Sequence, residues 1–376
     1  MHLLLCNSRP RSCPSNLCNP GGHISHNAMG FISCCYFTGL LLWKWITKLL
    51  EPIFHGTCII ISPFGRHSYH YQILMFSESL RACLWAFRRE PLTRLTNNRR
   101  IWFDAFDLLF NYRGIGWTWP QGVQIPKETR NVKSTKLFLL TTLQWVILGL
   151  IVADFSHYTV QVMLFQSNGS LIGSIFDPSL PPLLRYTRST IITILNGIAV
   201  FFGLENQYYI TTFIAVGLFQ QSPTLWPPLS ERPYRATSLN KFWTTCWHQC
   251  FREIFIGFGG KPFAYVFGKA GGVMGAFLIS GILHDLGCWG LGRGTDPLRI
   301  TGFFLMNGVG LILEHVYKSV TGKRVGGVVG LIWTYIWVVA WGSILFDAWF
   351  EHGLGTNRYW PTQSSPAFWA HSMLFR

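Results

Sequence analysis

Charged residues are scarce in this chain of 376 residues, since Asp, Glu, Lys and Arg together make up 12% of it. That is about half the usual share for a soluble globular protein. Acidic residues are the scarcer sign, 16 against 31 Lys and Arg, which gives a formal net charge of +15. The basic residues collect in segments between long apolar runs, as cytosolic loops of membrane proteins do, so no nucleic-acid partner is predicted.

Several motifs of catalysis and metal binding are also missing. There is no Gly-x-Ser-x-Gly nucleophile elbow, no P-loop and no Gly-x-Gly-x-x-Gly, so serine-nucleophile chemistry and nucleotide hydrolysis are not supported. The ten cysteines follow no disulfide or zinc-ligand spacing, and those beside apolar runs are expected to behave as small hydrophobes. The sequence therefore predicts no metal site and no bound cofactor.

Apolar residues are abundant instead, with 49% hydrophobic and 16% aromatic content. Runs of membrane-spanning length predict an all-α polytopic membrane protein, with roughly six to nine transmembrane helices around an intramembrane reaction chamber. Four regions are expected: an atypical N-terminal segment (1–77) with a possible first span at 31–50, a basic cytosolic segment (78–136), a membrane core (137–346) and an unstructured aromatic C-terminal tail (347–376).

The basic segments set the expected topology. Residues 137–153 form a strong span and 158–165 a weak one, and the apolar runs 190–204 and 209–219 are separated by Glu205-Asn206. If the basic segments on both sides of this region are cytosolic, the number of crossings between them is even, and both two and four fit. The tripeptide Asn168-Gly169-Ser170 is a glycosylation sequon that fits a lumenal loop.

The stretch 238–286 is the centre of the chain. Its first half places apolar residues at helical spacing, which predicts an amphipathic helix with Ser238 as its N-cap and the glycines from Gly257 onward as its end. His248 falls on the polar face of this helix. The apolar stripe is formed by Leu239, Phe242, Trp243, Cys246, Trp247, Phe251, Ile254 and Phe255.

The second half of the stretch is an apolar run of membrane-spanning length that leads to His284. Small residues recur every four positions along one line, which lets a neighbouring helix approach closely, and His284 is the next position on that line. An intramembrane imidazole is a functional candidate by default. The alternative interpretation is a structural histidine at a helix end beside Asp285. The line is formed by Gly268, Gly272, Ala276 and Ser280.

His248 and His284 are the candidate catalytic pair. A surface-lying or re-entrant helix that continues into a span can bring both imidazoles to one cavity, where one removes a proton from an alcohol and the other holds that alcohol or polarises a thioester carbonyl. A structural role for His248 on an interfacial helix stays open. Glu314 and His315 also interrupt an apolar span, and either could be a structural hydrogen-bond partner; for His315 a structural role is favoured.

Two sequence blocks resemble one known family. SLNKFWTTCWHQCFREIF (238–255) followed by FLISGILHDL (277–286) resembles the paired blocks of the wax synthase-like branch of the membrane-bound O-acyltransferases. WFDAFDLLFNYRGIGWTWP (102–120), WPPLSERPYRATS (226–238) and LEHVYKSVTGKRVGGVVGLIW (313–333) resemble further parts of it, so the resemblance covers roughly residues 80–341. It is closest in character to fungal members that acetylate terpenoid or meroterpenoid alcohols.

The resemblance implies an endoplasmic-reticulum enzyme that moves an acyl group from acyl-CoA, here acetyl-CoA, to the hydroxyl of a hydrophobic terpenoid-type acceptor in secondary metabolism. By position, His284 matches the catalytic histidine and His248 the second active-site residue. Four further residues are expected to contact substrate: Trp243, Trp247, Arg252 and Ser280. The N-terminal residues, to about residue 75, depart from the family's usual hydrophobic start.

Two other functions stay open at this point. One is a wax synthase that esterifies long-chain alcohols with fatty acyl-CoA. The other, from a different class, is a transporter whose histidines relay protons, although the sequence shows no internal repeat and no matched pair of interrupted helices. Acceptor identity, acyl length and oligomeric state do not follow from the sequence.

Overall fold

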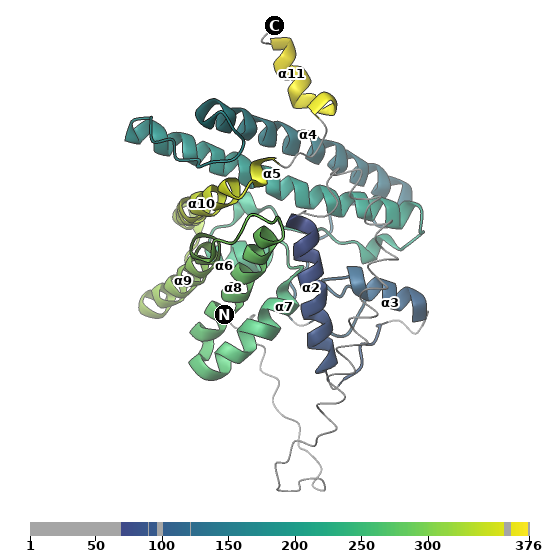
Figure 1. Ribbon diagram of the computed structural model, residues 1–376. Coiled ribbons are helices and arrows are strands. Elements are labelled where there is room, and N and C mark those ends of the chain that lie inside the picture. The colour runs from purple at the N-terminus through teal and green to yellow at the C-terminus, as the bar shows by residue number, and fades with distance from the viewer. Residues whose placement is uncertain (1–68, 89, 96–100, 121, 357–361, 375–376) are drawn as a thin grey trace, which may run out of the picture. The chain divides into compact units, whose positions relative to one another are not determined.

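The computed structural model describes residues 69–88, 90–95, 101–120, 122–356 and 362–374, and within these ranges the chain is helical, with no β-sheet. The all-α prediction is confirmed. The α-helices are α2 (Tyr69–Ala86), α3 (Ile101–Phe110), α4 (Thr135–Asn168), α5 (Pro182–Gly217), α6 (Leu239–Lys241), α7 (Arg252–Ile254), α8 (Lys261–Trp289), α9 (Pro297–Thr321), α10 (Gly327–Glu351) and α11 (Pro366–Leu374) (Figure 1).

Five segments of the described residues are long and apolar enough to cross a membrane. The possible first span at residues 31–50 lies outside the described residues. The chain divides into two units between Arg66 and His67, and every described residue lies in the second. The boundary expected at residue 77 needs correction, because it falls inside α2. The five segments are Thr135–Gln166, Pro182–Gly217, Arg252–Trp289, Pro297–Thr321 and Gly327–Glu351.

Helices α4 and α5 run side by side as two long unbroken helices (Figure 1). Ser134 caps α4 by accepting a hydrogen bond from the backbone N–H of Leu137, and Gly169 ends it in the left-handed conformation. The break expected at Glu205-Asn206 is wrong, because α5 continues through both residues. Asn206 is buried against Gly149 of α4, a position where a small residue allows close approach.

The segment Arg252–Trp289 is a helical hairpin rather than a single straight span. Gly268 has φ +66°, a backbone conformation that favours glycine, and the chain reverses there. As a result, a side chain at Gly275 would come within 2.5 Å of the carbonyl oxygen of Gly259, and one at Gly272 within 2.9 Å of that of Gly260. The helix end expected at Gly257 is also wrong, since the π-helix η4 (Phe255–Gly260) passes through it and these glycines pack against α8.

The C-terminal residues contain more structure than the unstructured tail expected from the sequence. Helix α10 extends to Glu351, and Asp347 accepts hydrogen bonds from Ser174 and the backbone N–H of Ile175. Helix α11 packs on α4, where Asp154 accepts hydrogen bonds from the hydroxyl of Ser365 and the backbone N–H of Ala367. Two single carboxylates among mostly apolar residues hold this end of the chain.

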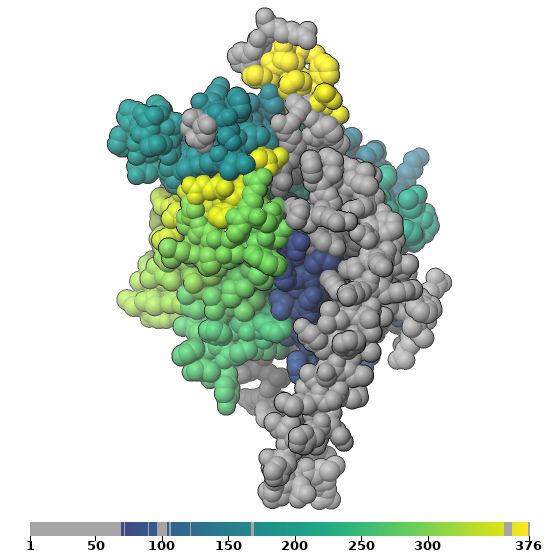
Figure 2. Space-filling view, viewed as in Figure 1, coloured from purple at the N-terminus to yellow at the C-terminus, as the bar shows by residue number. Residues whose placement is uncertain are grey.

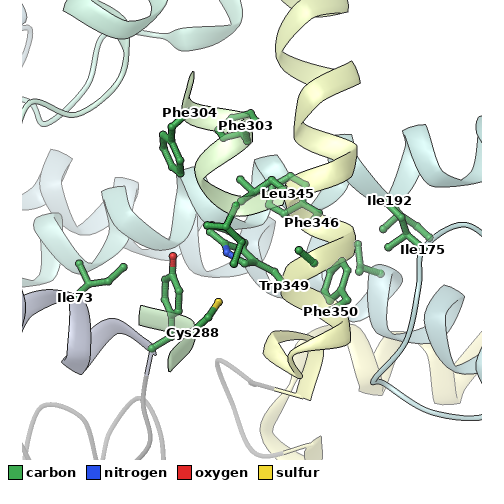
Figure 3. Close-up of a cluster of buried hydrophobic side chains, with 14 of the residues drawn as sticks. Ile73, Ile175, Ile192, Cys288, Phe303, Phe304, Leu345, Phe346, Trp349 and Phe350 are labelled. Carbon is green, nitrogen blue, oxygen red and sulfur yellow. The ribbon is translucent and has the colours of Figure 1, made fainter. Parts of the chain in front are cut away.

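A buried apolar cluster joins α2, α4, α5, α8, α9 and α10. Trp349 of α10 lies near its middle, with Phe303 and Phe304 of α9 on one side and Phe350 of α10 on another (Figure 3). In the space-filling view the purple surface of α2 lies directly beside the green surface of α8 (Figure 2). This arrangement places the end of α8, which carries His284, inside the cluster rather than at its edge.

The α4–α5 pair gives two crossings between the two basic segments, so both are expected on the cytosolic side. Cysteines introduced at Lys133 and Arg235 are expected to react with a membrane-impermeant maleimide from the cytosolic face of sealed microsomes, and one at Ser179 only after the membrane is opened. These three positions are exposed. The parent chain corrects for its native cysteines, and labelling of Arg235→Cys from the lumenal side alone contradicts the topology.

Candidate active site

His284 is held in a defined tautomer by its own helix. Its Nδ1 lies 2.7 Å from the carbonyl oxygen of Ser280, one turn earlier in α8. A carbonyl oxygen only accepts, so Nδ1 carries the proton and donates, and the lone pair of the neutral ring is on Nε2. The ring is half-buried, and Nε2 accepts no hydrogen bond from the described residues. An imidazole in this state is ready to accept a proton.

The residue next to His284 does not pair with it. Asp285 accepts a hydrogen bond from the backbone N–H of Asp296, at 2.7 Å, and so orders the loop between α8 and α9. The His284 ring instead lies nearly parallel to that of Phe304 at 4.4 Å, and to that of Trp349 at 6.5 Å. His284 is therefore set between aromatic side chains of α9 and α10, away from any charged hydrogen-bond partner that would fix it as a structural residue.

His248 lies in a break between two helices, not on a continuous amphipathic helix. Ser238 does cap the first turn, as expected, by accepting from the backbone N–H of Lys241. After α6 the chain forms the π-helix η3 (Phe242–Cys246) and then leaves helical geometry until α7. The continuous helix expected over this stretch is therefore wrong, although its apolar residues do face the core.

A buried glutamine explains the break. The side-chain amide of Gln249 donates to the carbonyl oxygens of Trp243 and Trp247, at 2.9 and 3.2 Å, so it satisfies backbone groups that a helix would have paired internally. Non-helical backbone within a membrane protein is tolerated where protein covers it. The helical spacing of the apolar residues predicts a continuous helix here and gives no sign of the turn. A buried Gln249, which can form hydrogen bonds with backbone groups, was the one feature of the sequence that could have indicated it.

The electrostatic surroundings keep His248 neutral. Its ring packs against Trp247 at 5.5 Å and Phe251 at 5.8 Å, and its Nδ1 is buried without a hydrogen-bond partner. Burial first, then repulsion by His284 and by the Arg113 guanidinium, lower the pKa of His248 to about 3.

Trp243 and Trp247 pack on each other, and Trp247 contacts the ring of His248. The Trp243 indole N–H donates to Oδ1 of Asn307 at 3.0 Å, and Asn307 is fully buried in α9. The Trp243 ring contacts the rings of Phe277 and Phe303, and the Trp247 ring contacts Phe201 of α5. Asn307 was missed by sequence reasoning, although a single amide in an apolar span was the available signal.

Arg113 was also missed. Its side chain is 5% exposed and donates to the carbonyl oxygens of Pro228 and Pro227, and to the Tyr208 hydroxyl at 2.6 Å. Its positive charge contributes to the low pKa of His248. In the sequence, the position of Arg113 in the RGIGW segment was the feature that could have indicated it.

The other two expected substrate contacts have different positions. Ser280 is buried and contributes its carbonyl oxygen to His284, so its observed role is to orient that ring. Arg252 is half-buried at the start of α7, four residues after His248 along the chain. Among the described residues, no group of three His, Cys, Asp or Glu side chains could hold a metal ion.

Glu314, one of the two residues that the sequence offered as a structural hydrogen-bond partner, has that role. Its carboxylate accepts from the backbone N–H of Leu239 and Asn240, at 2.6 and 3.0 Å, and from the Trp333 indole at 3.1 Å. It therefore holds the first turn of the segment that leads to His248. His315, by contrast, is exposed.

Replacing Glu314 with leucine is expected to destabilise the protein by about 1–3 kcal/mol, because buried N–H donors lose their acceptor. Thermal unfolding of the purified protein measures this as a lower Tm. His315→Leu is the matched control on the neighbouring exposed position, with an expected change within about 0.5 kcal/mol. Equal Tm values for Glu314→Leu and the parent chain would show that the carboxylate does not support this segment.

Part of the chain is similar to one known family. Residues 226–306 match the model of the membrane bound O-acyl transferase family, and this region contains both His248 and His284. The match confirms, at the level of the family, the resemblance that the two sequence blocks carry.

Individual proteins similar to this chain share about a quarter to a third of the aligned residues with it. An acetyltransferase, spyB of Aspergillus fumigatus, is 26% identical over 172 residues, which cover 39% of this chain and 29% of the relative. A long-chain-alcohol O-fatty-acyltransferase of Simmondsia chinensis is 33% identical over 108 residues (26% and 30%). The acetyltransferase eriL of Hericium erinaceus is 24% identical over 241 residues (60% and 59%). These alignments span between three tenths and three fifths of the relatives' own length.

Proposed function

We propose that this chain, a relative of the membrane bound O-acyl transferases through residues 226–306, is an acyl-CoA-dependent O-acyltransferase that esterifies a hydroxyl group of a hydrophobic alcohol. The observation that carries the proposal is the state of His284. Its Nδ1–H is fixed on the carbonyl oxygen of Ser280, so Nε2 is an available base within an apolar, aromatic surrounding. The same region matches the family, which favours acyl transfer over a proton-relaying transporter.

The proposed reaction moves one proton through His284. Nε2 takes the proton of the alcohol as its oxygen attacks the thioester carbonyl carbon, and the carbonyl oxygen gains negative charge. When that intermediate collapses, the carbon–sulfur bond breaks and the ester carbonyl re-forms. The CoA thiolate takes the proton back from the imidazolium, which leaves an ester, free CoA and a neutral His284.

His248 has a separate part in this scheme. A neutral imidazole has one N–H, and on Nε2 this group donates to the acyl carbonyl oxygen as charge develops on it. A charged His248 would repel the imidazolium that His284 becomes, so its low pKa suits the role. Trp243 and Trp247 provide an apolar wall, and Arg252 a positive charge for the phosphate groups of CoA.

The donor and acceptor are narrowed by similarity. The relatives named as acetyltransferases favour acetyl-CoA as co-substrate. The resemblance of the two sequence blocks to fungal members of the family favours a terpenoid or meroterpenoid alcohol of secondary metabolism as acceptor. The relative named as a long-chain-alcohol O-fatty-acyltransferase favours the second candidate, wax-ester synthesis from fatty acyl-CoA. An integral membrane protein of this family is proposed to reside in the endoplasmic reticulum, where both substrates reach it from the cytosol and the bilayer.

Release of free CoA tests the proposal. Purified protein in lipid nanodiscs is incubated with acetyl-CoA or palmitoyl-CoA and a panel of alcohols, and the thiol is measured together with the ester product. We expect alcohol-dependent CoA release that is faster with acetyl-CoA. Faster release with palmitoyl-CoA and a long-chain alcohol would favour the wax synthase, and no release with any pair would overturn acyl transfer.

A further inference from the structure

Two buried hydrogen-bond donors near His284 have no acceptor among the residues that the structure describes. Tyr69, at the start of α2, is 5% exposed, and Trp349, on α10, is 8% exposed. Within the described part of the chain, neither the Tyr69 hydroxyl nor the Trp349 indole N–H makes a hydrogen bond. Most buried polar groups in proteins are paired, so an unpaired group in a folded protein needs a reason. Here two such groups lie together.

The two side chains contact each other and converge on the end of α8. Their rings meet edge-to-face at 5.3 Å, and the Trp349 ring lies nearly parallel to the His284 ring, at an interplanar angle of 20°. Gly287 makes room for Tyr69, since a side chain there would come within 2.7 Å of the Tyr69 ring. Gly287 is one turn beyond His284, so both donors lie beside the base of the proposed reaction.

The chemistry of the attack separates these donors from the reacting hydroxyl. The alcohol oxygen gives its proton to Nε2 and uses one lone pair to attack the carbonyl carbon, so it has one lone pair left and cannot accept hydrogen bonds from two donors. The Trp349 N–H and the Tyr69 hydroxyl are therefore offered to another oxygen atom of the bound substrates. The acyl carbonyl oxygen is already assigned to His248 in the proposed function.

We infer that Tyr69 and Trp349 form a binding site for a second oxygen atom of the acceptor alcohol. The atom must be a hydrogen-bond acceptor, because an indole N–H can only donate; a ketone, ether or ester oxygen, with two lone pairs, suits two converging donors. This inference rests on the proposed acyltransferase function and narrows its substrate class. A simple long-chain alcohol has no such oxygen and leaves both donors unpaired, which disfavours it as the acceptor.

Matched acceptors test the inference. Bicyclic hydroxyketones are compared with the same alcohols lacking the ketone oxygen, using the full chain in nanodiscs with acetyl-CoA. We expect the parent chain to prefer hydroxyketones in kcat/KM. Tyr69→Phe keeps the ring and removes the hydroxyl, and Trp349→Phe replaces the indole with a smaller ring that has no N–H. Each is expected to reduce the ratio of kcat/KM for hydroxyketones to kcat/KM for simple alcohols by about tenfold or more, through KM for the hydroxyketones.

Trp337→Phe is the control. It also removes an indole N–H from α10, but that group already donates to the carbonyl oxygen of Met306, so the preference between acceptors is expected to stay the same. Equal losses on both alcohol classes in Trp349→Phe would overturn the inference in favour of the acyl carbonyl as ligand. No loss on either class would leave the pair without a binding role.

A binding measurement separates this inference from the proposed function. If the parent chain releases no CoA with any alcohol, acyl transfer is wrong, yet the hydroxyketone alone can still be titrated into the nanodiscs. A Kd at least about tenfold weaker in Trp349→Phe than in the parent chain supports the donor pair. Equal Kd values for the two proteins overturn it.

Discussion

Replacing His284 with alanine is expected to reduce transfer by a factor on the order of 10²–10⁴, the contribution typical of a general base. The protein should still insert and accumulate, because the ring packs on Phe304 and Trp349 from one side of a large aromatic cluster and its one hydrogen bond stays within α8. The loss is expected in kcat, since binding of acyl-CoA does not need the base. Product formation and CoA release measured together on equal amounts of protein check it.

His352 provides a matched control. It lies directly after α10 and likewise places Nδ1 on a carbonyl oxygen one turn back, that of Ala348 at 2.8 Å, but it is not part of the proposed mechanism. His352→Ala is expected to keep transfer close to that of the parent chain. Near-normal turnover of His284→Ala would remove His284 from the mechanism, and an equal loss in both variants would point to a structural effect of losing the ring instead.

Replacing His248 with alanine is expected to raise the reaction barrier by roughly 2.7–4 kcal/mol, the cost of losing one donor to a developing oxyanion. Glutamine keeps an N–H donor near that position, so His248→Gln is expected to retain part of the activity. Both variants should bind acyl-CoA as the parent chain does. The measurements are kcat for each variant and the Kd for acyl-CoA.

A purely structural His248 gives a different pattern. Replacement of a side chain that only covers a turn changes little, within about 0.5 kcal/mol, so near-normal and equal rates for the two variants would contradict the donor role. The low pKa of His248 also predicts how its role depends on pH. Because its ring stays neutral down to about pH 3, its donor capacity does not change over the range of about pH 5–8 in which an ordinary imidazole titrates.

Part of this site could be predicted from the sequence, because the pattern of small and apolar residues that indicates it lies within single segments of the chain. The small-residue line that ends at His284 predicts a closely packed helix face, and Ser280, one step earlier on that line, is the residue that fixes the ring. The apolar positions of the stretch 238–255 likewise predict which side faces the core. Both inferences need only the spacing of residues along one helix.

The rest depends on contacts that leave no periodic pattern in the sequence. At His248, the side chain of Gln249 forms hydrogen bonds with backbone carbonyls, and at Gly268 the chain reversal brings Gly259 and Gly275 into close contact. Glu205 and Asn206 looked like a break because polar residues are costly in lipid, yet α5 continues through both, and Asn206 packs on Gly149 of α4. Tertiary packing overrides local pattern at each of these points.

The hydrogen bonds of Glu314 also set an order of events during biosynthesis. Leu239, whose backbone N–H donates to the Glu314 carboxylate, is synthesised 75 residues earlier. At a synthesis rate of about 5–20 residues per second, the first turn of the central stretch exists without its acceptor for roughly 4–15 s. The Trp243 indole N–H likewise has no acceptor until Asn307, 64 residues later, has been synthesised. The segment that carries His248 can therefore become ordered only after α9 has left the ribosome, so a chain interrupted before that helix has both histidines but no assembled site.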